Sequence, residues 1–303
     1  MSSTARDPAP DPTDGVGIAL ALTAAVGFGL AIAVSRFAYE GGTNGFTVAS
    51  FRSCVATLVV LGFCLVTGRS VRVARREWLH LTGLGVLLSV LFYGNVGAVE
   101  YISVGLTALL LFTFPTMIAT MESVLTRTMP APAKAIALVV AFAGLFLMLG
   151  VSFGSSHPLG IALALSAALA AATNAVWYSR TVRHVDIVVA TLHMTIGATV
   201  TVLVVSVLHG SFVAPVNVIG WGGLIGVAIL QSGIAPVYFA GLARIGPLKS
   251  GMLGNIQPVT SIGAAFLLFG EWLTPVQLVG GAMVIAGVLI MQRHDARAAA
   301  GRT

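Results

Sequence analysis

The chain has 303 residues, of which 57% are hydrophobic and 9% are charged. A water-soluble domain carries roughly 25% charged residues, so this composition excludes an ordinary soluble globular protein, whose surface needs more charge. The formal net charge of +6 would by itself also fit an anionic partner such as nucleic acid. The positions of the basic residues argue instead for a membrane protein that has no nucleic-acid partner.

Ten apolar runs of about twenty residues follow one another along the chain. An α-helix of about twenty residues crosses the roughly 30 Å hydrocarbon core of a bilayer. One such run could be a buried core helix, but ten in succession predict an all-α integral membrane protein with ten transmembrane helices. The expected spans are 15–35, 46–67, 78–100, 106–125, 131–151, 158–179, 187–208, 219–243, 247–269 and 274–291.

The two ends of the chain differ from the apolar runs. Residues 1–14 are polar and acidic, and we expect them to form a disordered cytoplasmic tail. Residues 292–303 are expected to form a basic cytoplasmic tail. The first run, 15–35, is too long for the apolar region of a signal peptide and follows no strongly basic segment, which predicts a retained helix.

The basic residues between the spans predict the orientation. Lys and Arg accumulate on the cytoplasmic side of membrane proteins, and an even number of spans puts both termini on one side. If that side is cytoplasmic, the outside loops hold only Arg36, and Arg52 lies within a span. We therefore expect a protein of the cell (inner) membrane with both termini in the cytoplasm. The basic residues on the cytoplasmic side are then Arg6, Arg69, Arg72, Arg75, Arg76, Arg127, Lys134, Arg180, Arg183, Arg244, Lys249, Arg293, Arg297 and Arg302.

An internal repeat with an offset of 143 residues runs through the chain. Residues 17–26 read GIALALTAAV and residues 160–169 read GIALALSAAL, and the same offset pairs Pro115 with Pro258. Each repeat contains five spans, so the second must enter the membrane from the opposite side. Inverted repeats are typical of secondary transporters, in which they place the solute site near the bilayer midplane. The repeats are residues 15–151 and 158–291.

Two long stretches and one residue pair form a recognisable set. They are GAVEYISVGLTALLLFTFPTMIAT (97–120), GLARIGPLKSGMLGNIQPVTSIGAAFLLFGEWLTPVQLVGGAMVIAGVLI (241–290) and Phe51–Arg52. This set resembles the EamA domain of the drug/metabolite transporter superfamily, over nearly the whole chain after residue 14. The resemblance implies ten helices around a central cavity. It does not name the solute, since members of the superfamily move amino acids, nucleosides and toxic compounds.

Two prolines are expected to bend helices beside the cavity. Pro115 and Pro258 lie near the middle of spans four and nine and are related by the repeat. Proline inside a helix removes one backbone hydrogen bond and bends the axis, and the freed carbonyl is tolerated where it faces protein or a wet cavity. Packing alone is the alternative reason for both prolines.

Polar side chains within the spans are candidates for the lining of the solute path. Unpaired amides are unfavourable in hydrocarbon and should point inward. For each of them, a hydrogen bond between helices is the alternative role. The candidates are Tyr93, Asn95, Asn174, Gln231, Tyr238, Asn255 and Gln257.

Ionisable groups within the spans are candidates for gating and coupling. Arg52 and Glu100 are expected near the outer ends of spans two and three, where an ion pair between them would close an outward gate. The alternative is that Arg52 extends to the interface. Glu122 and His193 fall in the inner thirds of spans four and seven. Either could load and release a coupling proton, or be structural.

Glycines predict where helices approach closely. Gly222 and Gly226 form a pair of small residues four positions apart, and Gly280, Gly281 and Gly287 crowd the last span. Small residues at such spacings permit close backbone contact between membrane helices. We expect these glycines to serve packing and not ligand binding.

These features favour a secondary carrier that moves a small organic metabolite or drug by alternating access, with export suggested by the resemblance. An uptake permease and a facilitative channel remain as alternatives. An intramembrane enzyme would need a nucleophile with a base, a metal cluster or paired carboxylates, and the scattered His and Glu show no such grouping. We therefore expect no catalysis, no cofactor and no metal. The partners expected are the solute, a possible proton and the bilayer, while the sequence leaves the oligomeric state open.

Overall fold

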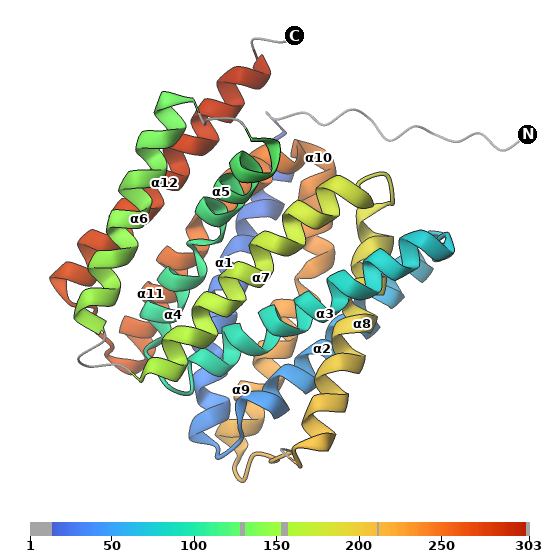
Figure 1. Cartoon of the computed structure of the whole chain (residues 1–303). Helices are drawn as coiled ribbons and strands as arrows, with labels where there is room; N and C mark the ends of the chain where they lie inside the picture. Colours follow the sequence, from blue (N-terminus) through green and yellow to red (C-terminus); the bar gives the residue numbers. More distant parts are fainter. Residues whose placement is uncertain (1–13, 128–130, 153–156, 211, 301–303) are drawn as a thin grey trace, which may run out of the picture.

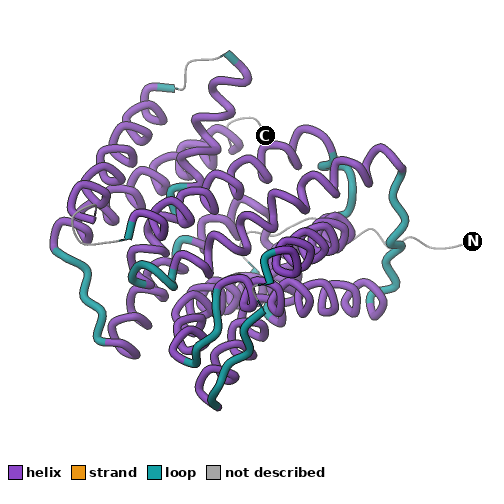
Figure 2. The backbone as a smooth tube through the Cα atoms, turned by 60° about the horizontal axis from the view of Figure 1, so that its bottom comes forward, coloured by secondary structure: helices purple, strands orange, loops and turns teal. Residues whose placement is uncertain are grey.

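The computed structural model describes residues 14–127, 131–152, 157–210 and 212–300. All regular structure within these residues is helical, and short loops connect the helices (Figure 2). The expected tail at 1–14 lies outside the described residues except for Asp14. That residue caps the first helix through a 2.9 Å hydrogen bond from the backbone N–H of Val16 to its carboxylate.

Each half of the chain forms five spans. In the first half these are α1 (Gly15–Glu40), α2 (Gly45–Val66), α3 (Arg75–Ala98), α4 (Val104–Leu111) with α5 (Phe114–Thr126), and α6 (Pro132–Ser152). In the second half the first two spans are α7 (Pro158–Thr181) and α8 (Ile187–Leu208). The eighth span combines α9 (Val218–Ala228), the π-helix η1 (Ile229–Gly233) and the part of α10 (Ala235–Gly254) up to Gly246. The ninth combines the end of α10 with α11 (Ile256–Phe269), and the last is α12 (Pro275–Ala300).

The ten predicted spans are confirmed in number and order. Nine described segments are long and apolar enough to cross a membrane, and the tenth span, α6, has a shorter described apolar part, Pro132–Leu147. The chain is therefore a multi-pass membrane protein. The first backbone N–H groups of a helix have no carbonyl partner within the helix. At the start of several spans, a side-chain oxygen accepts a hydrogen bond from one of these N–H groups. These capping residues include Asn44, Ser103, Asp186 and Asn217.

Five features refine or change the sequence prediction. Span four is split between α4 and α5, and span eight contains the π-helix. The α10 segment has non-helical angles at Gly246 (φ 76°, ψ 166°), so the eighth span ends there. The first span runs on to Glu40, and α12 runs on to Ala300. Most of the expected basic tail thus continues the last helix.

The two repeats are related by the predicted offset throughout the fold. Helices α1, α3 and α6 begin at Gly15, Arg75 and Pro132. Their counterparts α7, α9 and α12 each begin 143 residues later, at Pro158, Val218 and Pro275. Close contacts obey the same offset. A Cβ on Gly17 would lie 2.6 Å from Cγ2 of Ile245, and a Cβ on Gly160 would lie 2.7 Å from Cγ2 of Ile102. Since Gly160 and Ile245 are the repeat partners of Gly17 and Ile102, the two halves contact each other reciprocally, as an inverted repeat requires.

The packing of α6 against α12 shows the same reciprocity. These helices lie side by side at one edge of the bundle (Figure 1). A Cβ on Gly144 would lie 2.4 Å from the carbonyl oxygen of Gly280, and a Cβ on Gly287 would lie 2.6 Å from that of Ala137. Only glycine permits so close an approach of two backbones. The predicted packing role of Gly280 and Gly287 agrees with this contact.

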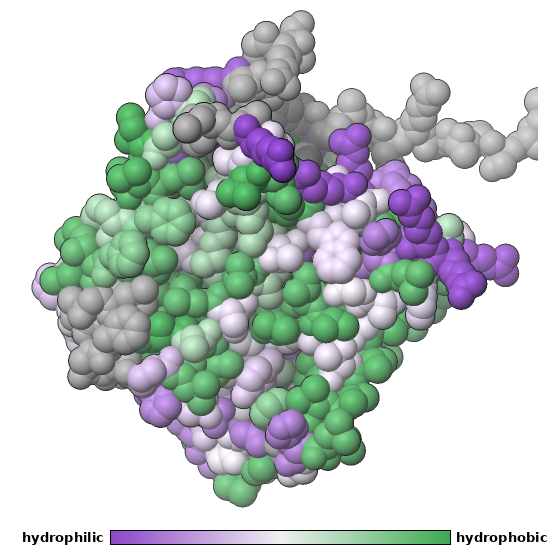
Figure 3. All heavy atoms as spheres, in the orientation of Figure 1, coloured by the Kyte–Doolittle hydropathy of each residue, from purple (hydrophilic) through white to green (hydrophobic). Residues whose placement is uncertain are grey.

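The two ends of the bundle differ in character. α1 begins and α12 ends at the top of Figure 1, and we call this end the termini face and the other end the opposite face. Hydrophilic side chains gather densely toward the termini face, whereas apolar side chains dominate the middle of the side shown in Figure 3. Exposed apolar residues such as Leu58, Phe146, Val200 and Leu267 suit contact with lipid tails.

Candidate solute-binding site

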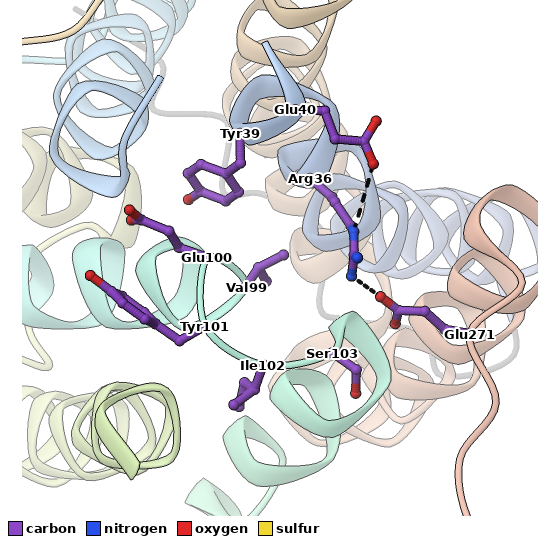
Figure 4. A pocket seen from close by; sticks show the side chains of 9 residues that line it. All are labelled: Arg36, Tyr39, Glu40, Val99, Glu100, Tyr101, Ile102, Ser103 and Glu271. Atoms are coloured by element: carbon purple, nitrogen blue, oxygen red, sulfur yellow. Dashed lines mark hydrogen bonds and ion pairs between the residues drawn. The ribbon is translucent and has the colours of Figure 1, made fainter. Parts of the chain in front are cut away.

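A cavity of about 560 Å³ opens at the opposite face. Three segments line it: the end of α1, the connection between α3 and α4, and the connection between α11 and α12 (Figure 4). We call this cavity the mouth. Its lining residues are Arg36, Tyr39, Glu40, Val99, Glu100, Tyr101, Ile102, Ser103 and Glu271.

Glu271 joins the three segments of the mouth. One carboxylate oxygen pairs with Nη1 of Arg36 on α1, and the other accepts a 3.0 Å hydrogen bond from the backbone N–H of Val104 at the start of α4. A carboxylate at a helix N-terminus also interacts favourably with the helix dipole. The turn that presents Glu271 depends on Gly270, which ends α11 with φ 63°, a left-handed conformation that favours glycine.

The mouth carries excess negative charge. Its lining contains three glutamates, Glu40, Glu100 and Glu271, but one basic side chain, Arg36, whose guanidinium lies 3.8 Å from Glu40 and pairs with Glu271. Glu100 is exposed and accepts a 3.1 Å hydrogen bond from the backbone N–H of Gly45 at the start of α2. It therefore anchors a second helix start at the rim.

Aromatic residues lead from the mouth into the bundle. The hydroxyl of Tyr39 donates a 2.6 Å hydrogen bond to the carbonyl of Val96, close to the end of α3. One turn deeper, the ring of Tyr93 stacks on Phe46 with 4.3 Å between centroids. The carbonyl of Val96 lies one turn along α3 from that of Phe92, which accepts a hydrogen bond from the Arg52 side chain of α2. Tyr39 therefore connects the mouth with the buried part of α2.

Arg52 is buried and does not form the ion pair that the sequence suggested. Its residue exposure is 7%, its Nη1 donates a 3.4 Å hydrogen bond to the carbonyl of Phe92, and its guanidinium lies 4.0 Å from the centre of that ring. The expected partner, Glu100, instead caps α2. The predicted Arg52–Glu100 pair is wrong for this conformation because Glu100 sits at the rim, whereas the guanidinium turns inward onto α3.

The structure separates the predicted amides into two groups. Asn174 donates a 2.8 Å hydrogen bond to the carbonyl of Leu84, and Asn255 donates a 2.7 Å bond to the side chain of Gln292. Both therefore join helices, the alternative role named above. Asn95 and Gln231 each have a buried side-chain oxygen with no hydrogen-bond partner in the described part of the chain. Buried polar atoms normally have a partner, so each of these oxygens is available to accept a hydrogen bond from another molecule.

The remaining predicted residues do not line the mouth. Tyr238 is half-buried, with its ring 6.0 Å from that of Phe28. The backbone carbonyl of Gln257 approaches α1, where it would lie 2.6 Å from a Cβ on Gly29. His193 lies within α8, with Nδ1 3.0 Å from the carbonyl of Val189, and Glu122 is exposed on α5. Their proposed roles in solute contact and coupling stay predictions.

The two predicted bends are present. Pro115 is the second residue of α5 and follows the break at Phe112 and Thr113, while Pro258 is the third residue of α11 and follows the break at Asn255. Proline supports a helix start because its missing N–H has no helical partner there. Both prolines thus define where a span is interrupted.

Sequence reasoning missed most of the residues at the mouth. Arg36, Tyr39, Glu40 and Tyr101 were not among the candidates, and Glu271 appeared only within the stretch 241–290 that resembles the EamA domain. One signal was available: Arg36 is the single basic residue predicted for the outside loops, and a lone basic residue among acidic ones indicates an ion pair. The pairing with Glu271, 235 positions away in the chain, became visible only with the fold.

Ten helical spans in two inverted repeats, with a polar cavity at one end, define the architecture of a membrane transporter. Comparison with known proteins agrees: the EamA-like transporter family matches residues 15–150 and again 158–293. The chain belongs to the EamA-like transporter family. The resemblance to the drug/metabolite transporter superfamily is thereby confirmed.

Individual relatives are similar over most of their length. An uncharacterized transporter of Archaeoglobus fulgidus is 27% identical over 270 residues, which cover 86% of this chain and 92% of that protein. A solved structure described only as "Crystal structure of protein" has a TM-score of 0.66 at 19% identity and covers 93% of this chain and 98% of its own. At this identity the second match shows a common fold.

Proposed function

We propose that this transporter is a secondary carrier that exports a small organic solute across the cytoplasmic membrane by alternating access. With the termini in the cytoplasm, as the basic residues predict, the mouth opens to the outside. Tyr93, Asn95 and Gln231 are proposed to contribute to the solute path, and Glu122 and His193 are the candidates for proton coupling.

One observation carries this proposal: two regions related by the repeat differ in packing. Tyr39 lines the mouth, whereas its repeat partner Val182 is fully buried in a cluster with Leu81 and Leu84 at the termini face. An inverted repeat can exchange such states between its halves, because each half can adopt the conformation of the other. The described conformation is then one of two, and its mirror state would open the termini face.

Reconstituted vesicles test the proposal. Purified protein in proteoliposomes would be screened with labelled metabolites and drugs for flux that saturates with concentration and accelerates when unlabelled solute is present on the far side. Vesicles without protein provide the background. A carrier predicts both saturation and acceleration. Flux that stays linear with concentration and ignores solute on the far side would contradict the proposal and favour the channel alternative.

A further inference from the structure

Arg52 differs from the arginines that form ion pairs in the described part of the chain. Arg36, Arg69 and Arg244 lie near the ends of the spans, and their carboxylate partners are Glu271, Asp186 and Asp14 respectively. Arg52 is more deeply buried, yet no described carboxylate lies within 4 Å of its guanidinium. Burial of a charge without a counter-ion is strongly unfavourable, so evolution retains such a group mainly where it has a function.

The contacts of Arg52 leave most of its hydrogen-bonding capacity unused. A guanidinium has five N–H donors, and the one hydrogen bond in the described part of the chain is the long contact from Nη1 to the carbonyl of Phe92. The ring of Phe92 covers one flat face of the guanidinium. The remaining donors lie at the edge, where a planar acceptor pair can bind.

The segments that pack on α2 around Arg52 carry unsatisfied acceptors. The hydroxyl of Ser232 in the π-helix donates a 3.2 Å hydrogen bond to the backbone carbonyl of Arg52, which places the preceding residue, Gln231, on the segment beside it. Asn95 lies on α3 three residues beyond Phe92 and is only 6% exposed. The side-chain oxygens of both amides lack partners. A π-helix within a span often marks a functional site.

These groups also lie below an opening. Tyr39 lines the mouth and donates to the carbonyl of Val96. Arg52 donates to the carbonyl of Phe92, one turn away on the same helix. The chain therefore combines, beneath one cavity, a buried cation without a counter-ion and two amides with free acceptor oxygens. A solute that offers both an anionic group and hydrogen-bond donors would satisfy all three.

We propose that Arg52 binds the carboxylate of the transported solute, while Asn95 and Gln231 accept hydrogen bonds from its hydroxyl or amino groups. This inference rests on the proposed carrier function and names its solute class: a small carboxylic acid with neighbouring donor groups. One guanidinium matches a monoanion. A phosphate dianion would need a second cation, and the guanidinium of Arg36 at the mouth is already paired with Glu271.

The first test compares acids with their neutral amides. Thermal stabilisation of the purified protein would be measured at constant ionic strength with lactate and lactamide, glycolate and glycolamide, and mandelate and mandelamide. At least one acid is expected to stabilise the wild type, with its amide at least about tenfold weaker. Arg52→Gln should abolish this stabilisation, whereas Arg293→Gln, the same change at an exposed arginine of α12, should preserve it.

The second test needs no ligand and separates binding from a structural role. If Arg52 only joined α2 to α3, Arg52→Gln would lower the melting temperature of the ligand-free protein. If it is an uncompensated charge kept for a solute, the melting temperature should stay unchanged or rise. A clear fall would overturn the proposal, as would a panel in which no acid stabilises the wild type.

The vesicle assay keeps this inference distinct from the carrier function. Saturable flux of an acid that Arg52→Gln abolishes supports both. Saturable flux of a neutral or cationic solute that Arg52→Gln leaves intact overturns the carboxylate site and leaves the carrier standing. Linear flux that ignores solute on the far side contradicts the carrier itself.

Discussion

Glu271 is the residue on which the described conformation of the mouth depends most. Its carboxylate makes an ion pair with α1 and a hydrogen bond to the start of α4, and its side chain is 15% exposed. By contrast, the Arg36–Glu40 contact at 3.8 Å is a surface pair whose glutamate side chain is 50% exposed. Exposed pairs contribute little because water and salt screen them.

Replacement of Glu271 by Gln should therefore destabilise the protein. The charge on the ion pair and the charge-assisted bond to the α4 N-terminus are both lost, and we expect a loss of about 1–2 kcal/mol. Thermal unfolding of the purified protein in detergent measures the effect. Glu40→Gln is the matched control, with an expected change of about 0.5 kcal/mol or less. Equal effects of the two changes would show that the burial of Glu271 does not matter.

At the residue scale, the sequence located polar side chains within the spans but did not predict their partners. Asn174 and Asn95 are both amides within apolar helices, but one binds a neighbouring carbonyl and the other has a free oxygen. Spans of this composition are apolar on every side, so no amphipathic pattern fixes the rotation of each helix. The partner of an amide then depends on tertiary packing alone.

At the scale of helices, interruptions of the spans are the main structural result. Span four breaks before Pro115, span nine breaks before Pro258, and span eight contains the π-helix from Ile229 to Gly233. The sequence indicated the proline breaks, because the cause lies in one residue. It gave no sign of the π-helix, which packs on α2 through the hydrogen bond from Ser232 to the carbonyl of Arg52.

Removal of the break in span four should slow transport without loss of stability. Alanine at position 115 restores a backbone N–H that can donate to the carbonyl of Leu111, and α4 and α5 could then join into one straight helix. We expect Pro115→Ala to melt no lower than the wild type and to transport several-fold more slowly, measured as initial flux in proteoliposomes.

Pro132→Ala provides the control for this change. Pro132 is the first residue of α6, where proline interrupts no hydrogen bond, so its replacement should leave flux unchanged. If Pro115→Ala transports at the wild-type rate, the bend serves packing alone.

The glycine contacts between α6 and α12 can be tested in the same way. Gly287→Ala places a methyl group 2.6 Å from the carbonyl oxygen of Ala137, so the two helices must separate. We expect a loss of about 1–3 kcal/mol, measured by thermal unfolding. Gly263→Ala in α11 meets no atom within 4 Å and should cost nothing. Tolerance of Gly287→Ala would show that this helix pair is not tightly packed.

The sequence predicted some close approaches and missed others. Gly287 and Gly280 lie at a helix contact as expected, but a Cβ on Gly222 would meet no atom within 4 Å, whereas one on Gly223 would lie 2.3 Å from the backbone of α1. Adjacent glycines differ by about 100° around a helix. Choice between them needs the rotation of the helix, which the sequence did not supply.

At the scale of the whole molecule, the repeat was predicted most completely. The offset of 143 residues, read from matching segments and prolines, recurs in the starts of helices and in reciprocal glycine contacts. Such a pattern is visible in a sequence because it compares the chain with itself. The difference between the two ends was not visible, since both conformations of an inverted repeat share one sequence.

The central claim is that the two ends of the molecule open alternately. Its most direct test is a pair of distance measurements between spin labels, in protein whose Cys54 and Cys64 have been replaced by Ala. One pair, at Glu40 and Glu100, spans the mouth. The other, at Arg183 and Ala243, occupies the positions 143 residues later. All four side chains are exposed, so labels are accommodated.

Alternating access predicts opposite responses of the two pairs. A transported solute should shift the population toward a shorter Glu40–Glu100 distance and a longer Arg183–Ala243 distance, by redistribution between the same two states. If both distances shift in the same direction, or neither responds to a solute that shows saturable flux, the two ends do not exchange and the account is contradicted.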